Sequence, residues 1–176
     1  MTDKERYENA LAFATKKHDG QYRIGGLPYI THPTAVAQIV KEKGGDNDAV
    51  IAALFHDLLE DTDATEAEIL ALGNEKILRS VKLLTKTKGY VMKDYVDGIK
   101  KDKTAFLVKG ADRLHNLCSA VCADTEFKRR YIYETIDWYL DFMPEIPSAV
   151  KNLAKTLDAP LKDLPFLYEP IDNWKK

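Results

Sequence analysis

Hydrophobic and polar residues recur along most of the chain with the period of an α-helix. No stretch of useful length shows the two-residue alternation of a half-buried strand. Clusters of glycine and proline separate the periodic segments, as is typical of loops. The pattern therefore predicts an all-α fold of about eight or nine helices. The expected helices span 3–17, 31–43, 46–61, 65–72, 74–84, 90–101, 104–121, 125–143 and 148–157.

The chain has 176 residues, a length typical of one domain with a substantial core. We expect that domain to span residues 1–157. Residues 158–176 read as a tail, because Pro160, Pro165 and Pro170 interrupt any helix there. The tail carries three aromatic residues, which leave open whether it packs on the same domain or on a neighbouring subunit. The oligomeric state stays open as well.

The segment Val50–Thr62 stands out because its first half is apolar on every side. Such a helix is expected to be buried all round. Four ionisable residues nevertheless follow within it, namely His56, Asp57, Glu60 and Asp61. Ionisable groups on a buried helix are costly unless they are paired or bound to a metal. On an unbroken helix Glu60 would lie on the face between His56 and Asp57, which favours Glu60 over Asp61 as the proton acceptor.

Composition and charge narrow the function classes. The net charge is −2, so there is no overall electrostatic footprint for nucleic acid. No apolar run approaches the ~20 residues of a membrane span, and the polar N-terminus does not resemble a signal peptide. Cys118 and Cys122 lie four residues apart and lack a second pair at zinc-finger spacing. We expect them to be reduced, packed thiols, which fits a cytoplasmic protein. The partner that we expect is a small molecule.

Four residues from three predicted helices are candidate metal ligands: His32, His56, Asp57 and Asp112. Imidazole and carboxylate together suit a divalent ion such as Mn²⁺, Fe²⁺, Co²⁺ or Zn²⁺. Such an ion lowers the pKa of bound water and polarises a phosphoryl oxygen.

The sequence motifs around these candidate ligands resemble those of a known protein family. The sequences His18–Arg23, Pro28–Pro33, His56–Thr62, Thr85-Lys86 and Ala111–Asn116 occur in this order. Together they resemble the HD-domain metal-dependent phosphohydrolases, in the hydrolase branch of the RelA/SpoT alarmone enzymes. The resemblance covers roughly residues 5–155 and is to the stand-alone form, the small alarmone hydrolases, with no room for a synthetase domain.

The resemblance implies hydrolysis of the 3′-pyrophosphate of a nucleotide such as ppGpp, usually with Mn²⁺. By position it implies that His32, His56, Asp57 and Asp112 hold the ion. It also implies that Glu60 and Asp61 orient or deprotonate the attacking water, that Arg23 contacts phosphate and that Asn116 contacts the nucleotide. Lys109 is expected to add positive potential near the substrate.

Two positions depart from the family pattern. Ile24 stands where relatives usually carry a basic residue that packs on the base, and it offers apolar contact without charge. Ser119, after Cys118, stands where an arginine-threonine pair is usual. Both are expected to line the nucleotide site and to change base selection more than hydrolysis.

Other readings remain open at this stage. The chain can be an HD-type phosphatase acting on other nucleotides, as a 5′-nucleotidase or an NADPH phosphatase, or an inactive nucleotide sensor. Two further residues near the ligands are expected to be structural: His18 as a hydrogen-bonded histidine and Tyr29 as loop packing.

Overall fold

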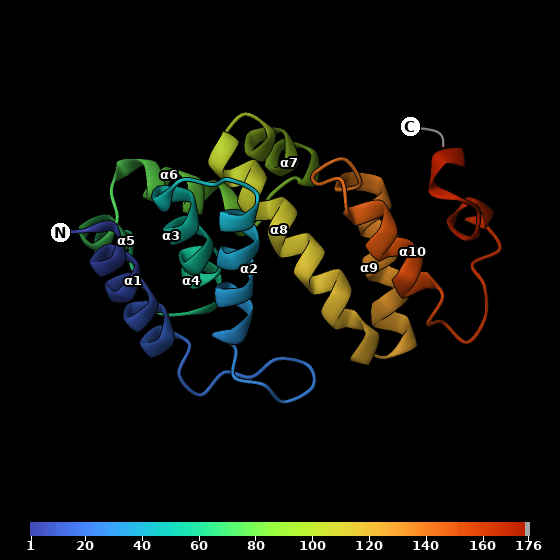
Figure 1. Ribbon diagram of the computed structural model, residues 1–176, viewed down its shortest axis with the longest axis horizontal. Helices are drawn as coiled ribbons and strands as arrows, with labels where there is room; N and C mark the ends of the chain where they lie inside the picture. The colour runs from blue at the N-terminus through green and yellow to red at the C-terminus, as the bar shows by residue number, and fades with distance from the viewer. Residues whose placement is uncertain (175–176) are drawn as a thin grey trace. The chain divides into compact units, whose positions relative to one another are not determined.

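The computed structural model describes residues 1–174 of the chain. These residues contain ten α-helices and three short 3-10 helices, and their one β-bridge joins Tyr22 to Pro28. The predicted all-α class is therefore confirmed. The chain divides into two compact units, Met1–Asp112 and a second that begins at Arg113. Figure 1 shows the helices in chain order.

The bounds of the helices follow the predicted segments closely. In the first unit they are α1 (Asp3–Lys17), α2 (Thr31–Glu42), α3 (Asn47–Phe55), α4 (Leu58–Asp61), α5 (Glu66–Leu72), α6 (Glu75–Leu84) and α7 (Met92–Lys100). Helix α8 (Lys103–Ser119) begins in the first unit and ends in the second. The second unit continues with η1 (Ala120–Cys122), α9 (Thr125–Trp138), α10 (Ile146–Ala154), η2 (Pro165–Tyr168) and η3 (Ile171–Asn173).

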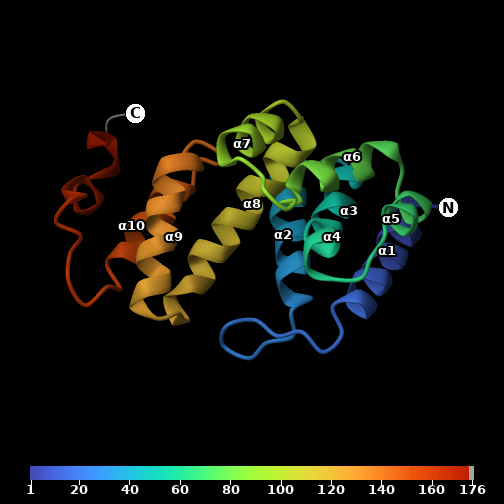
Figure 2. The ribbon, with the colours of Figure 1, turned by 180° about the vertical axis from the view of Figure 1, so that it is seen from behind.

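Helix α3 forms the centre of the first unit. Every residue from Ala49 to Phe55 is buried, as its apolar sequence predicted. It packs against α1, α2 and α6, and both views show α2 and α3 side by side (Figures 1 and 2). The helix therefore carries the residues that follow Phe55 into the interior of this unit.

The predicted central helix, 46–61, is wrong in one respect, because it breaks into α3 and α4 at His56 and Asp57. The ring Nδ1 of His56 lies 2.7 Å from the carbonyl oxygen of Ala53. An unbroken helix would offer this carbonyl to the amide of Asp57, so the imidazole competes with the backbone. Asp57 then adopts φ −99° and ψ −5° and starts the short helix α4. The regular helix is therefore interrupted at these two residues.

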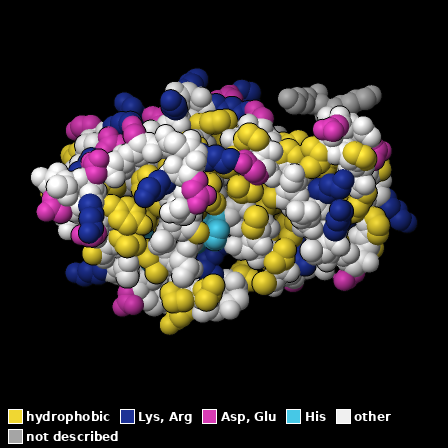
Figure 3. Space-filling model, in the orientation of Figure 1, with side chains coloured by type: hydrophobic (Ala, Val, Ile, Leu, Met, Phe, Trp, Pro, Cys, Tyr) yellow, Lys and Arg dark blue, Asp and Glu magenta, His cyan; other side chains and the backbone are white. Residues whose placement is uncertain are grey.

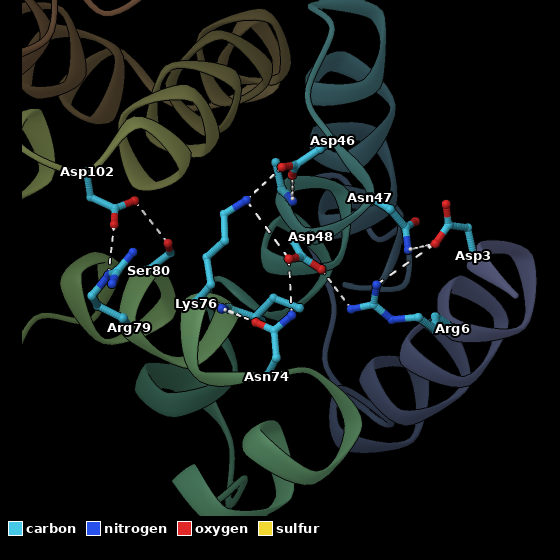
Figure 4. A network of polar contacts seen from close by, with 12 residues as sticks. Asp3, Arg6, Asp46, Asn47, Asp48, Asn74, Lys76, Arg79, Ser80 and Asp102 are labelled. Carbon is cyan, nitrogen blue, oxygen red and sulfur yellow. Dashed lines mark hydrogen bonds and ion pairs between the residues drawn. The ribbon is translucent and has the colours of Figure 1, made fainter. Parts of the chain in front are cut away.

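A network of polar contacts ties the starts of several helices together in the first unit (Figure 4). Asp48 at the start of α3 accepts hydrogen bonds from Arg6 of α1 at 2.7 Å and from Asn74 before α6 at 3.1 Å. Asp102, directly before α8, accepts from the amide of Ala105 at 2.8 Å and from the hydroxyl of Ser80 at 3.0 Å. Asp48 thus ties α3 to α1 and to the start of α6, and Asp102 fixes where α8 begins.

The second unit packs α9 against α10, which lie side by side in both views (Figures 1 and 2). The guanidinium of Arg113 lies 4.1 Å from the ring centroids of both Tyr131 and Tyr139 and donates to Glu134 at 2.7 Å. The described part of the tail contacts these helices through buried Leu167 and a hydrogen bond from Tyr133 of α9 to Asp163. The predicted tail spans 158–176, and its last two residues lie outside the described residues. The boundary of the tail at residue 157 stays a prediction.

Two further predictions concern the cysteines and the membrane. Cys118 and Cys122 are both free, but the prediction that they are packed is wrong, because both are exposed. They lie where α8 gives way to the short helix η1, so helical spacing no longer places them on one buried face. Among residues 1–174, no helix is long and apolar enough to cross a membrane.

Candidate functional site

The polar cluster of the first unit forms where three helices begin, end or run past one another. His32 lies in the first turn of α2, followed by Pro33, whose missing N–H costs nothing at that position. His56 and Asp57 occupy the break between α3 and α4. Asp112 projects from α8. Elements far apart in the sequence thus bring these four side chains together.

The ligand atoms converge on one small volume. His32 Nε2 lies 3.1 Å from Asp112 Oδ1 and 3.8 Å from Asp57 Oδ2. His56 Nε2 lies 3.0 Å from Asp57 Oδ2 and 3.7 Å from Asp112 Oδ1. One ligand atom from each of His32, His56 and Asp57 falls within 4.8 Å of the others, the spacing expected around a single ion. His32, His56 and Asp112 are buried, with at most 5% exposure.

The donor set fits a divalent metal ion. The carbonyl of Ala53 can only accept, so Nδ1 of His56 is the protonated nitrogen in the neutral ring. The lone pair of His56 Nε2 then faces the cluster, where Asp57 Oδ2 lies 3.0 Å away without the geometry of a hydrogen bond. A metal-binding histidine is oriented in this way, by donating its other ring N–H to a carbonyl or carboxylate. Two imidazoles and two carboxylates are ligands for a borderline divalent ion.

The charges of the cluster shift the pKa values of its members. Burial alone would lower the pKa of His56, but the carboxylates of Asp57 and Asp112 raise it to about 10. Burial would raise the pKa of Asp57, yet the His56 imidazolium brings it down to about 2. The pKa of Asp112 is likewise well below its usual value, because Lys109 and the two histidines outweigh burial. Without an ion, a proton on His56 therefore supplies the positive charge that the carboxylates need.

Two residues outside the four ligands contact them directly. Tyr29 Oη donates a hydrogen bond of 2.7 Å to Asp57 Oδ2. Lys109 Nζ donates to Asp112 Oδ2 at 2.9 Å. Burial and the Asp57 charge raise the pKa of Tyr29, so its hydroxyl remains a donor. The expectation that Tyr29 serves in loop packing missed this bond; the only sequence signal was its position three residues before His32.

The acidic pair lies on α4, directly after the ligands of the helix break. Glu60 Oε2 accepts a hydrogen bond of 2.8 Å from the backbone amide of Lys86. Partial burial and the charges of Asp57 and Glu60 raise the pKa of Asp61. The helix break removes the spacing argument that favoured Glu60 as the proton acceptor.

The loop between α1 and α2 presents Arg23 and Ile24. The Arg23 guanidinium lies 5.7 Å from the ring centroid of Tyr29, which links it to the cluster through Asp57. Ile24 is 59% exposed, and Tyr22 and Leu27 on the same loop are 68% and 62% exposed. Figure 3 shows hydrophobic side chains at the edge of the molecule over this loop. This apolar surface comes from the loop that carries the predicted phosphate ligand.

Asn116 and Ser119 lie in the last turns of α8, in the second unit. Ser119 Oγ donates a hydrogen bond of 2.8 Å to the carbonyl oxygen of His115 on its own helix. Asn116 is half-buried. Their assignment to the nucleotide site remains a prediction.

Comparison with known proteins identifies relatives of this chain. A protein from Synechocystis sp. named probable guanosine-3′,5′-bis(diphosphate) 3′-pyrophosphohydrolase is 32% identical over an alignment that covers 95% of this chain and 23% of the relative. A Brucella ovis protein named GTP pyrophosphokinase rsh is 34% identical, with 94% of this chain and 23% of the relative covered. The chain thus spans about a quarter of the length of these relatives.

A solved structure and a family model complete the comparison. The structure, described as a metazoan ortholog of SpoT that hydrolyzes ppGpp, matches with a TM-score of 0.70 at 23% identity, covering 85% of this chain and 94% of that one. This likeness shows the fold. The model of the HD domain matches residues 10–142, which include all four candidate ligands. The chain therefore belongs to the HD domain family, and its relatives confirm the resemblance to the RelA/SpoT hydrolase branch.

Proposed function

We propose that this chain is a metal-dependent hydrolase that removes the 3′-pyrophosphate from ppGpp or a closely related alarmone. The observation that carries the proposal is the convergence of two imidazole nitrogens and two carboxylates at the helix break after α3. The name of the Synechocystis relative supports the reaction, because its alignment covers 95% of this chain at 32% identity. The substrate is a small nucleotide.

We assign the ion to His32, His56, Asp57 and Asp112, and propose Mn²⁺, with Fe²⁺, Co²⁺ or Zn²⁺ as substitutes. When bound, the ion supplies Lewis acidity to the phosphoryl oxygens and lowers the pKa of water. Lys109 holds the outer oxygen of Asp112, and Tyr29 bonds the oxygen of Asp57 that faces the histidines, so the two residues fix the orientation of both carboxylates.

The acidic pair of α4 handles the attacking water. A base with a raised pKa is a better proton acceptor near neutral pH, and Asp61 has this property. Glu60 is held by the Lys86 amide and orients the water. The water oxygen attacks the phosphorus next to the 3′ oxygen, and its proton passes to Asp61. The bond from phosphorus to the 3′ oxygen breaks, and the 3′ oxygen leaves with the bonding electron pair and takes a proton from solvent water to become a hydroxyl. Pyrophosphate is released, and Asp61 returns its proton to solvent.

The substrate contacts are proposed from the resemblance. Arg23 binds phosphate oxygens and Ile24 covers the base by apolar contact. Lys109 adds positive potential, and Asn116 and Ser119 contact the nucleotide. We propose that residues 1–157 form the hydrolase domain with 158–176 as its tail. We place the protein in the cytoplasm, a reducing compartment that suits the exposed thiols of Cys118 and Cys122.

Product analysis with Mn²⁺ tests the proposal. Purified protein is incubated with ppGpp, ppApp, NADPH and a 5′-monophosphate, and released pyrophosphate and orthophosphate are quantified separately. Pyrophosphate from ppGpp or ppApp is the expected result. Orthophosphate from the other two alone would replace the proposal with a general nucleotide phosphatase, and no release from a protein with bound Mn²⁺ would replace it with a sensor.

Two variants of the acidic pair refine the assignment. Asp61→Asn is expected to lower kcat by about 10²–10⁴-fold, the usual contribution of a general base. Glu60→Gln keeps the acceptor for the Lys86 amide and is expected to lower kcat less. A Glu60→Gln variant that loses more activity than Asp61→Asn would reverse the two roles.

A further inference from the structure

His18 is a buried histidine at the start of the loop between α1 and α2, with 2% exposure. Its Nδ1 lies 2.8 Å from Oε1 of Gln21. An amide oxygen only accepts, so the shared hydrogen belongs to Nδ1 of His18. Nε2 of His18 is buried and has no hydrogen-bond partner among the described residues.

The first connection from His18 leads to the acidic pair. Gln21 uses its oxygen for His18 and its Nε2 to donate a hydrogen bond of 2.8 Å to the backbone carbonyl of Asp61. The amide of Gln21 is therefore oriented at both ends. His18 holds the side chain whose other end fixes the backbone at the end of α4.

The second connection from His18 leads to a metal ligand. The imidazole ring lies against Tyr29, with ring centroids 4.7 Å apart and the planes at 32°. The hydroxyl of Tyr29 donates to Asp57 Oδ2 at 2.7 Å. The position of the His18 ring thus limits where the Tyr29 hydroxyl can lie.

The loop between these connections closes on itself through backbone hydrogen bonds from Arg23 to Leu27 and from Tyr29 to Gln21. Gly20, Gly25 and Gly26 have positive φ angles of 78°, 99° and 88°. Tyr22 and Leu27 leave most of their side chains in solvent. The loop is held at its start by the His18–Gln21 pair and at its end by Tyr29, the two points that reach α4 and the helix break.

We propose that His18 is a positioning residue that holds Asp61 through Gln21 and Asp57 through Tyr29. Packing alone does not explain a histidine at position 18. Its buried Nε2 is an acceptor without a partner, which is costly, and a phenyl ring would fill the same space without such an acceptor. The catalytic half of this proposal rests on the proposed function, whereas the half that concerns metal binding does not.

Two substitutions at residue 18 separate the connections. His18→Phe keeps a ring against Tyr29 but removes the hydrogen bond to Gln21. His18→Asn keeps an amide N–H close to the position of Nδ1, so it can still donate to Gln21, but it removes the ring. Gln21→Ala and Tyr29→Phe are the matched controls, because each cuts one connection at its far end.

The variants that cut the connection through Gln21 and those that cut the connection through Tyr29 have different expected results. His18→Phe and Gln21→Ala should each lower kcat by about 2- to 10-fold, the worth of one hydrogen bond, with the parental Kd for Mn²⁺. The double variant with His18→Phe and Gln21→Ala should have a kcat no lower than that of either single variant. His18→Asn and Tyr29→Phe should weaken Mn²⁺ binding by about 10- to 100-fold, and saturating Mn²⁺ should restore the kcat of both.

Calorimetric titration of Mn²⁺, steady-state kinetics and the melting temperature are measured for all variants. The proposal is overturned if His18→Phe and His18→Asn lower only the melting temperature, with kcat and the Mn²⁺ Kd at parental values. It is also overturned if the losses of His18→Phe and Gln21→Ala multiply. If the parent protein hydrolyses no nucleotide, the proposed function fails, while the Mn²⁺ titrations of His18→Asn and Tyr29→Phe still decide the connection to Asp57.

Discussion

Replacing Asp102 with alanine should destabilise the first unit, because this carboxylate fixes the start of the helix that carries Asp112. Asp102 directly precedes α8 and accepts a hydrogen bond from the Ala105 amide. It also accepts from the Ser80 hydroxyl and the Arg79 guanidinium (Figure 4). Its side chain is 11% exposed, whereas that of Arg79 is 67% exposed. The three bonds therefore differ in what their loss costs.

The expected cost follows from these environments. Removing a helix cap costs about 1 kcal/mol. Ser80 is fully buried, so leaving its hydroxyl without its acceptor costs about 1–3 kcal/mol. The exposed pair with Arg79 adds at most about 1 kcal/mol. Asp102→Ala should thus lower the free energy of unfolding by about 2–5 kcal/mol and the melting temperature by about 4–20 °C.

Urea denaturation at pH 7 measures this loss, and the double variant with Ser80→Ala tests its cause. Removing the hydroxyl as well removes the unpaired group, so the double variant should lose less than the sum of the two single variants. A loss under about 0.5 kcal/mol for Asp102→Ala, or full additivity in the double variant, would refute the reasoning.

The same comparison at low pH has a defined sign. Burial would raise the pKa of Asp102, but the bonds from Ala105, Ser80 and Arg79 lower it below its ordinary value. Such a carboxyl stabilises the fold above its unfolded pKa of about 3.9, and this contribution disappears as the pH falls through the folded pKa. The difference in stability between the parent protein and Asp102→Ala should therefore narrow below about pH 4.

Three further predictions concern the metal and the substrate. Since the carboxylates of Asp57 and Asp112 raise the pKa of His56 to about 10, a proton must leave its ring when an ion binds. The affinity for Mn²⁺ in calorimetry should therefore rise about tenfold per pH unit between pH 6.5 and 8.5, and a flat profile would contradict this role. Chelation should lower the melting temperature, and Mn²⁺ at about 100 times its Kd should restore about 2.7 kcal/mol; equal melting curves would argue against a site that forms only in the folded chain. Ile24→Lys should raise kcat/KM for the guanine alarmone over the adenine one by about 2- to 5-fold through a cation–π contact, and an unchanged ratio would remove Ile24 from base selection.

Local sequence chemistry was enough to predict most helix positions. The observed α1 has the predicted bounds, and Thr2 and Glu5 form a capping box at its start. Thr65 and Glu68 form the same motif at the start of α5. Pro147 lies in the first turn of α10, where its missing N–H is tolerated. Helix α9 ends at Trp138, before the predicted residue 143, because Tyr139 is fully buried and leaves the helical conformation with φ −127°.

The helix break at His56 and Asp57 could not be read from periodicity, which depends on side-chain hydrophobicity and is silent about side chains that bond to the backbone. The contact of the His56 ring with the Ala53 carbonyl produces the break and also orients Nε2 toward the cluster. The contacts of Tyr29 and Lys109 with the ligand carboxylates were missed for a related reason. Each depends on the exact turn of a loop or helix, and the motif order that pointed to the ligands does not specify it.

The charges of the cluster explain how metal binding can prepare the site for an anionic substrate. In the ion-free state the carboxylates of Asp57 and Asp112 are balanced by the His56 imidazolium and the Lys109 ammonium, which lie within 4 Å of them. A divalent ion displaces only the proton of His56, since Lys109 bonds the outer oxygen of Asp112 and can remain there. The exchange adds one net positive charge to a largely buried cluster, where charges are weakly screened. The site would therefore attract a polyphosphate more strongly after the ion binds. Removing Mn²⁺ by chelation should thus lower the affinity for the nucleotide, and a nucleotide that binds equally well to the chelated protein would contradict this coupling.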